Sequence, residues 1–152
     1  MDIRNAKTSD AGAIHSLISY YAELDRMLFC SVADIYEKLQ SFKVALEDGK
    51  IVGCCALQVA WRDLAEIKSL AVDNGSAGRG VGRALVAAML VDAEELGAEK
   101  VFTLTLEPDF FEKMGFVRVD KASLPMKVWS DCARCSKQDN CDEIAMVCEV
   151  CV

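Results

Sequence analysis

The chain has 152 residues, 53% of them hydrophobic and 27% charged, with a formal net charge of −7 at pH 7. This length and apolar content suffice for a substantial core, and we expect residues 1–152 to form a single domain. The acidic balance argues against a nucleic-acid partner, which needs an excess of Lys and Arg. The sequence also lacks an apolar run of bilayer length and an opening signal segment, so we expect no membrane association and a cytoplasmic location.

The first part of the chain predicts a strand and two helices. The strand covers residues 3–6, and the polar residues up to Asp10 are typical of a helix N-cap. The helix that follows carries Ile14, Ile18 and Tyr21 on one face. Ser31 is placed to cap the second helix in the same way.

A hairpin and a central strand come next. Strands over 42–47 and 51–60 flank Asp48-Gly49, a pair that is typical of a tight β-hairpin turn. Residues 64–73 then form a further strand, rich in apolar and β-branched side chains.

The last part of the chain predicts helices and strands in alternation. Apolar residues repeat with helical spacing over 81–96, and Gly97 ends that helix. We expect residues 120–142 to be an irregular, Cys-containing loop. The remaining expected elements are a strand over 101–106, a short helix over 108–114, and strands over 116–119 and 144–150.

The segment between strand 64–73 and helix 81–96 is the most informative in the chain. Its closely spaced glycines, Gly78, Gly80 and Gly82, let the backbone turn so that N–H groups and the helix N-terminus can hold a pyrophosphate. An ATP-hydrolysing P-loop is disfavoured, because Gly82 is followed by Arg83-Ala84 and not by Lys-Ser/Thr. A Rossmann site is disfavoured, because its glycines follow the first strand of the fold. The sequence therefore predicts a site for coenzyme A (CoA).

Three motifs in order resemble the GCN5-related N-acetyltransferase (GNAT) superfamily. Residues 77–82, Ala-Gly-Arg-Gly-Val-Gly, match its Gln/Arg-x-x-Gly-x-Gly/Ala pattern at every position but the first. Residues 3–14 resemble its first strand and helix, and Phe110 to Phe116 resemble its last helix and sixth strand. The resemblance implies an α/β layered fold, with a mixed, mostly antiparallel sheet whose fourth and fifth strands splay apart between helices. The residues it implies for cofactor binding are Leu70, Ala71, Val72, Ala77, Gly78, Arg79, Gly80, Val81, Gly82, Arg83 and Phe111.

The same resemblance implies acetyl transfer from acetyl-CoA to an amine. The backbone N–H of Leu70 is the group that would polarise the acetyl carbonyl. Glu66 is the candidate general base, and the alternative for it is an ion pair with its neighbour Lys68. Where many members carry a tyrosine, this chain has Phe111, so the CoA thiol leaves as the thiolate or takes a proton from water.

Further residues resemble the acetyltransferase domain of bacterial N-acetylglutamate synthases. That resemblance implies glutamate as the acceptor and a place at the first step of arginine synthesis. A pocket for glutamate needs cationic partners for its carboxylates, and the candidates are Lys68, Lys127 and Arg134, with Ser136 near Arg134. Ordinary solvated charge is the alternative for these side chains. The carrying motifs are Ile3-Arg-Asn-Ala6, Glu66-x-x-x-Leu70-Ala-Val72, Phe111-x-x-x-Gly115-Phe116, Val119-Asp120 and Leu124-Pro125.

Five of the eight cysteines lie in the last 21 residues. Cys132, Cys135 and Cys141 resemble half of a metal site, for zinc or an iron–sulfur cluster, with Cys148 or Cys151 as a candidate fourth ligand. Reduced thiols, or a disulfide formed in air, are the alternative that we favour.

Two other functions stay open at this point. One is a module that holds CoA with little turnover, and the other is a regulator that uses the C-terminal cysteines to sense a metal or an oxidant. The expected partner of the enzyme is a small amine, and a homodimer is left open.

Overall fold

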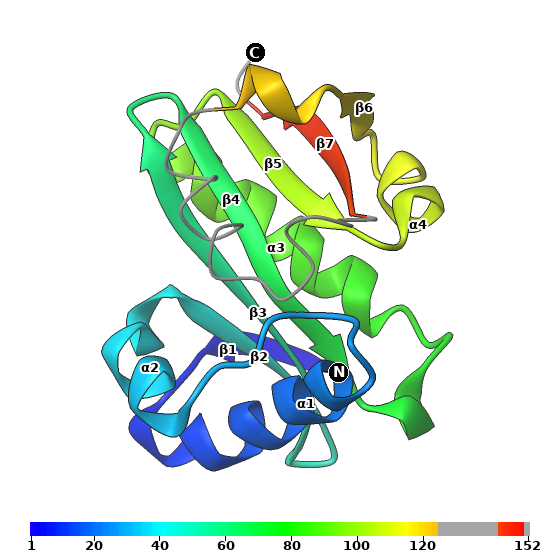
Figure 1. Ribbon diagram of the computed structural model, residues 1–152. Helices are drawn as coiled ribbons and strands as arrows, with labels where there is room; N and C mark the ends of the chain where they lie inside the picture. Colours follow the sequence, from blue (N-terminus) through cyan, green and yellow to red (C-terminus); the bar gives the residue numbers. More distant parts are fainter. Residues whose placement is uncertain (125–142, 151–152) are drawn as a thin grey trace. The chain divides into compact units, whose positions relative to one another are not determined.

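The computed structural model describes residues 1–124 and 143–150 (Figure 1). The chain divides into two compact units, called here unit 1 (Met1–Leu57 with Ile67–Met89) and unit 2 (Gln58–Glu66 with Leu90–Val152). Three elements run through both units: β3 (Lys50–Trp61), β4 (Leu64–Val72) and α3 (Val81–Glu95).

The strands of unit 1 form an antiparallel set. β1 (Asp2–Asn5) pairs with β2 (Phe42–Glu47), and β2 pairs with β3 through the predicted hairpin. The turn residues Asp48 and Gly49 have φ values of 52° and 75°. Two left-handed residues in succession match the right-handed twist of the paired strands, which explains why Asp-Gly forms this turn.

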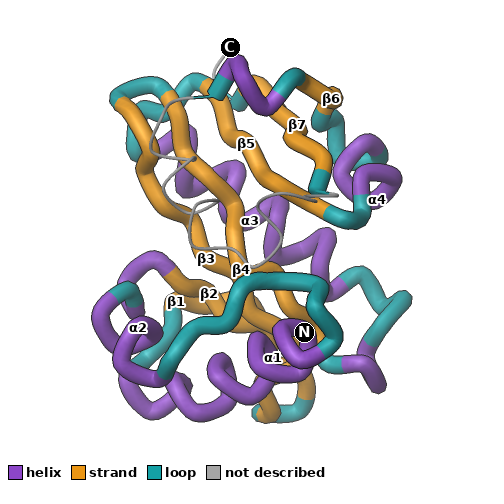
Figure 2. Tube along the Cα trace, in the orientation of Figure 1, coloured by secondary structure: helices purple, strands orange, loops and turns teal. Residues whose placement is uncertain are grey.

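The helices of unit 1 are α1 (Ala11–Glu23) and α2 (Val32–Glu37), with short 3-10 turns η1 (Thr8–Asp10) and η2 (Leu39–Ser41). Ser31 caps α2 as predicted: its Oγ accepts from the Asp34 N–H at 3.1 Å. Figure 2 shows both helices beside β1 and β2. The apolar positions of α1 and α2 pack onto the strands in one core cluster, which contains Ala11, Ile14, Ile18, Ile35, Leu39, Phe42, Val44, Cys54, Ala56 and Ala71.

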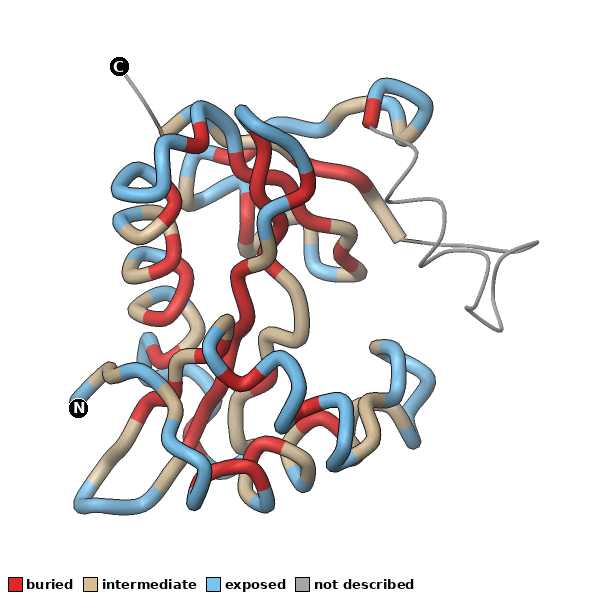
Figure 3. The backbone as a smooth tube through the Cα atoms, turned by 90° about the vertical axis from the view of Figure 1, so that its left-hand side faces the viewer, coloured by how far each residue is buried: buried red, intermediate tan, exposed pale blue. Residues whose placement is uncertain are grey.

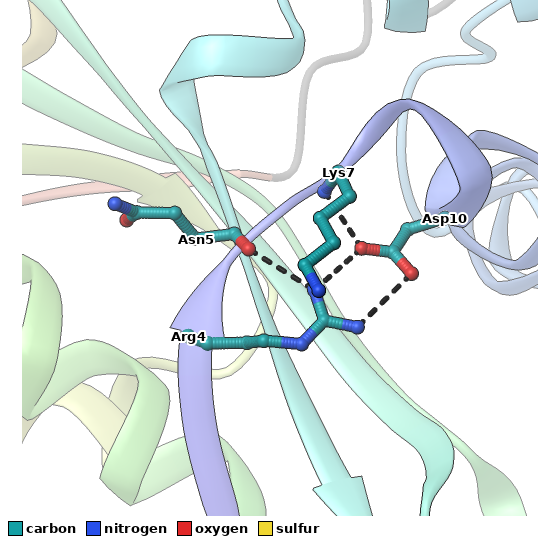
Figure 4. Close-up of polar contacts among 4 residues, drawn as sticks. All are labelled: Arg4, Asn5, Lys7 and Asp10. Atoms are coloured by element: carbon teal, nitrogen blue, oxygen red, sulfur yellow. Dashed lines mark hydrogen bonds and ion pairs between the residues drawn. The ribbon is translucent and has the colours of Figure 1, made fainter.

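An ion pair stabilises the turn between β1 and α1 (Figure 4). The Arg4 guanidinium donates to both carboxylate oxygens of Asp10, at 2.6 and 3.2 Å, and the Lys7 N–H donates to Oδ2 at 2.7 Å. Asp10 is the N-cap residue of α1, within the segment predicted to begin this helix, but its carboxylate makes no hydrogen bond to the N–H groups of α1. It accepts instead from the Lys7 N–H at the start of η1. It points back to β1 because Arg4 offers a charged donor there.

Unit 2 holds the rest of the sheet. β5 (Lys100–Thr105) pairs antiparallel with β7 (Ile144–Glu149), and β7 pairs antiparallel with β6 (Val117–Val119). A parallel ladder joins β4 to β5 over three residue pairs, from Leu64 with Lys100 to Glu66 with Phe102. The helical segments are α4 (Pro108–Glu112) and η4 (Lys121–Ser123), and Figure 1 shows α4 beside β6. The core cluster of this unit contains Ala60, Leu64, Phe102, Leu124 and Ala145.

The seven strands follow the order β1-β2-β3-β4-β5-β7-β6. The prediction of an α/β fold with a mixed, mostly antiparallel sheet is confirmed, and each predicted strand ends within one residue of the observed one. Divergence of β4 from β5 past Glu66 stays a prediction.

Buried and exposed residues alternate along the helices in Figure 3. Cys54 and Cys55 of β3 are fully buried, and burial raises the pKa of the Cys54 thiol to about 12.

Candidate active site

The chain turns from β4 into α3 through a segment that we call the glycine loop, residues 77–83. A 3-10 turn, η3 (Asn74–Ser76), leads into it, and the loop residues up to position 80 are exposed. Gly78 and Gly80 have φ values of +81° and +80°, which side chains other than hydrogen rarely allow. No atom lies within 4 Å of where a Cβ would stand on either. The backbone at Gly78 and Gly80 is therefore not covered by side chains, and a ligand can approach it.

From Gly78 to Arg83, the N–H groups of this loop have no acceptor among the described residues, whereas the Ala77 N–H donates to the Asn74 carbonyl at 3.4 Å. The first backbone hydrogen bond of α3 runs from the Ala84 N–H to the Gly80 carbonyl at 3.0 Å, and none is donated by Gly78 to Arg83. No acidic side chain stands in the first turn of α3. Unsatisfied N–H groups at a helix N-terminus attract an anion, and the helix dipole adds to that attraction. The loop can accordingly hold a phosphate or pyrophosphate.

Arg79 adds a cation to the loop and is held by an acid from β2. Its Nη1 lies 3.1 Å from Glu47 Oε2, and the side chains of Arg79 and Glu47 are 62% and 24% exposed. An exposed pair of this kind contributes little stability, about 0–1 kcal/mol. Its effect is to limit where the guanidinium can lie. Glu47 was not among the predicted site residues.

A glycine of β3 sets how closely α3 approaches the sheet. A Cβ on Gly53 would stand 2.8 Å from Val81 Cγ1 and 3.0 Å from Leu85 Cδ1. Val81 is the first residue of α3, so this close packing fixes the start of the helix and with it the N–H groups of the loop. The sequence analysis did not single out Gly53.

The candidate cofactor strand, the later half of β4, has an irregular backbone. Ser69 has a φ of 56°, in the left-handed region, and its carbonyl accepts from Cys54 Sγ at 3.5 Å. Of the predicted cofactor residues here, Ala71 is buried, whereas Leu70 and Val72 are partly exposed. The Val72 carbonyl accepts a hydrogen bond from the Tyr21 hydroxyl, another contact that sequence reasoning missed.

Glu66, the candidate base, lies in unit 2 at the last pair of the parallel ladder, opposite Phe102. It is 8% exposed, one of few buried charged residues among those described. Lys68, its predicted alternative partner and a candidate for acceptor binding, lies in unit 1 and is partly exposed. The role of each stays a prediction.

Phe111, predicted to contact the cofactor, lies inside an aromatic cluster of unit 2. It is 3% exposed, and its ring meets those of Phe110 and Phe116 edge-on, with centroids 5.0 and 5.1 Å away. Packing explains this side chain fully, and cofactor contact stays a prediction.

Several predicted residues lie outside the described part of the chain: Lys127, Arg134, Ser136, Cys132, Cys135, Cys141 and Cys151. Among residues 1–124 and 143–150, no group of three or more His, Cys, Asp or Glu side chains is arranged to hold a metal. No helix in these same ranges is long and apolar enough to cross a bilayer.

Comparison with known proteins bears on this site. Residues 35–118 match the profile of the acetyltransferase (GNAT) domain, a range that includes the whole glycine loop. An amino-acid acetyltransferase of Mycobacterium tuberculosis is 38% identical to this chain. The match covers 87% of this chain and 77% of the length of the relative.

Several solved structures share the fold over 98% of the chain. The protein Rv2747 of M. tuberculosis, in complex with CoA and NLQ, has a TM-score of 0.86 and 33% identity, and the match covers 99% of it. The N-acetylglutamate synthase of Neisseria gonorrhoeae, complexed with CoA and N-acetyl-glutamate, has a TM-score of 0.89 and 26% identity. The present chain covers 35% of that enzyme.

Proposed function

Because the chain belongs to the GNAT acetyltransferase family and is an acetyltransferase, we propose that it acetylates the amine of an amino acid, with acetyl-CoA as donor and glutamate as preferred acceptor. We also propose that both units form one domain, since β3, β4 and α3 run through each. Acetylation of glutamate would place the protein at the first step of arginine synthesis.

The glycine loop carries the proposal. From Gly78 to Arg83, the N–H groups have no acceptor among the described residues, and the dipole of α3 points its positive end at the same place. The CoA diphosphate is an anion of suitable charge and size for such a loop. The lost polar side chain at Ala77 removes one contact and leaves these backbone donors intact. Relatives with CoA bound, the M. tuberculosis and N. gonorrhoeae proteins, support the same assignment.

Acetyl-CoA supplies a thioester whose carbonyl carbon is open to attack by an amine. In our proposal the Leu70 N–H donates to the acetyl oxygen and stabilises the negative charge that develops on it. Glu66, nearly buried on β4, takes the proton from the acceptor ammonium directly or through water. Phe111 has no hydroxyl to offer a proton, so the thiolate leaves unaided or takes a proton from water.

The acceptor assignment draws on the relatives and on charge. One solved structure similar to this chain is an N-acetylglutamate synthase complexed with N-acetyl-glutamate, and one sequence relative is an amino-acid acetyltransferase. Lys68, Arg134 and Ser136 are the proposed contacts for the glutamate carboxylates, since cationic and hydroxyl donors suit them. This assignment is open to a direct test.

The test measures free CoA thiol released from acetyl-CoA with a panel of amines: glutamate, glutamine, aspartate, arginine and lysine. Glutamate should give the highest kcat/KM. Glu66→Gln should lower kcat by about 10²–10⁴-fold, the range for a lost general base, and leave CoA affinity by calorimetry unchanged. Full turnover in that variant removes Glu66 as the base, and a higher kcat/KM with another amine refutes glutamate as the preferred acceptor.

A further inference from the structure

A tyrosine hydroxyl of α1 binds the end of β4 within unit 1. Tyr21 Oη donates to the Val72 carbonyl oxygen at 2.6 Å, across 51 positions of the sequence. The Tyr21 ring is partly buried and meets the Tyr20 ring edge-on, with centroids 5.1 Å apart. Burial raises the pKa of the Tyr21 phenol above its ordinary value, so the hydroxyl keeps its proton at neutral pH and acts as the donor.

The bound carbonyl lies on the edge of β4 that faces away from β3. The Asp73 N–H donates to the Val52 carbonyl of β3 at 2.7 Å, so the backbone N–H and C=O groups of Asp73 point toward β3. Successive strand residues direct their backbone groups to opposite edges, and Val72 therefore directs its own away from β3. Ala71 agrees with this alternation, since its carbonyl oxygen lies 3.5 Å from the position of a Cβ on Gly53 of β3.

Leu70 shares this outer edge with Val72. An added strand of amide groups, such as a pantetheine arm, pairs with the N–H and C=O groups that such an edge presents. With one lone pair of its carbonyl engaged by Tyr21, Val72 offers the arm its N–H donor and a weaker acceptor. Of the two residues on this edge, Leu70 and Val72, only Val72 has its carbonyl hydrogen-bonded to Tyr21.

The main chain at Tyr21 is itself fixed. Its carbonyl accepts from the Arg26 N–H at 3.0 Å, which closes the C-terminal end of α1, and the adjacent Asp25 takes the left-handed conformation with a φ of 60°. The hydroxyl is thus presented from a fixed helix end, so it can hold Val72 in one place.

We propose that Tyr21 is a positioning residue for the pantetheine arm of CoA, and that it sets the register of the arm by occupying the Val72 carbonyl. The idea rests on the proposed function. Without the hydroxyl, the Val72 carbonyl becomes a stronger competing acceptor, and the end of β4 loses its hydrogen bond to α1. The arm then pairs less firmly, and its thioester is held less well beside Leu70.

The experiment compares Tyr21→Phe with Tyr20→Phe, using acetyl-CoA and acetyl-pantetheine as donors. Phe keeps the ring that packs in the core of unit 1. Tyr20 is the matched control, because it is 46% exposed and its hydroxyl makes no hydrogen bond within the described part of the chain. In Tyr21→Phe we expect KM for both donors to rise by about fivefold, the effect of one neutral hydrogen bond. The control should match the wild type with both.

Each other result overturns the proposal. A rise in KM for acetyl-CoA alone would mean that Tyr21 acts through the glycine loop, because acetyl-pantetheine lacks the diphosphate. Unchanged KM values would mean that the hydroxyl has no part in binding. KM does not depend on the fraction of folded enzyme, so a partly unfolded variant still gives an answer. A wild type that binds no CoA in calorimetry refutes the proposed function as well, whereas normal binding by the wild type beside an unaffected Tyr21→Phe refutes only the role of Tyr21.

Discussion

Replacing Gly53 by alanine should weaken CoA binding, although Gly53 lies on β3 and not in the glycine loop that we expect to contact the ligand. The added Cβ would stand 2.8 Å from Val81 Cγ1 and 3.0 Å from Leu85 Cδ1. Carbon atoms in contact prefer about 3.5–4.0 Å, so Val81 has to retreat by about 1 Å. A valine on a helix has one strongly preferred rotamer, so the backbone of α3 must move with it.

The expected size of the effect follows from that shift. Overpacking of this kind costs about 1–3 kcal/mol of folding free energy. A displacement of about 1 Å also takes N–H donors at the start of α3 out of hydrogen-bond range of a fixed phosphate oxygen. One lost hydrogen bond to a charged group is worth about 1.5–3 kcal/mol, so Kd for CoA should rise by about tenfold or more.

Calorimetry with CoA and thermal unfolding are the assays, and Gly12→Ala is the control. Gly12 lies in α1, and an added Cβ there meets nothing within 4 Å. That variant should bind CoA as the wild type does and gain up to about 1 kcal/mol of stability. If Gly53→Ala binds CoA with the wild-type Kd, then the start of α3 does not form the phosphate site, and the reasoning fails.

Three further predictions concern stability. Asp10→Asn should lower the free energy of unfolding by about 2 kcal/mol, because a nearly buried carboxylate loses its bonds from Arg4 and Lys7. These donors lower the pKa of Asp10, so the carboxylate contributes stability above about pH 4, and this contribution is lost as the pH falls further. Denaturant titrations of the variant should therefore show a weaker fall in stability below about pH 4 than those of the wild type. Ser31→Ala should cost about 1 kcal/mol, and Ser31→Asp, another good N-cap, should restore it; an equally unstable Asp variant would contradict capping as the cause. Gly97→Ala should cost about 1–2 kcal/mol by chemical denaturation, since its φ of +88° strains any side chain, and an unchanged midpoint would refute that conformation.

The sequence predicted the elements well wherever one local rule decided the outcome. The hairpin turn at Asp48-Gly49 and the cap at Ser31 depend on residues within a few positions of each other, and both are observed. Asp10 lies at the predicted start of α1, but its carboxylate binds Arg4, six positions earlier, and the Lys7 N–H instead of the N–H groups of α1. Neighbouring residues alone do not reveal which of two such partners wins.

The glycine loop was predicted from its glycines, but the residues that contact it or the neighbouring end of β4 were not predicted. Tyr21 was counted as one apolar position on a helix face, although its hydroxyl binds a carbonyl 51 positions away. Gly53 stands within an apolar strand, where nothing in the sequence reveals that Val81 lies against it. Glu47 and Arg79 are 32 positions apart, and only the folded chain brings them together. Contacts of this kind depend on tertiary packing, which periodicity and spacing do not encode.

Labelling of the two adjacent cysteines of β3, Cys54 and Cys55, can report when β3 becomes exposed to solvent. Thiol reagents attack the thiolate, and burial raises the pKa of both Cys54 and Cys55 so far that neither ionises in the native state at neutral pH. Cys30 and Cys148 are partly exposed, so a reagent can reach them in the native state. When the native protein is held in a labelling reagent, the slow phase of modification will therefore time the exposure of β3 to solvent, with no probe added to the chain.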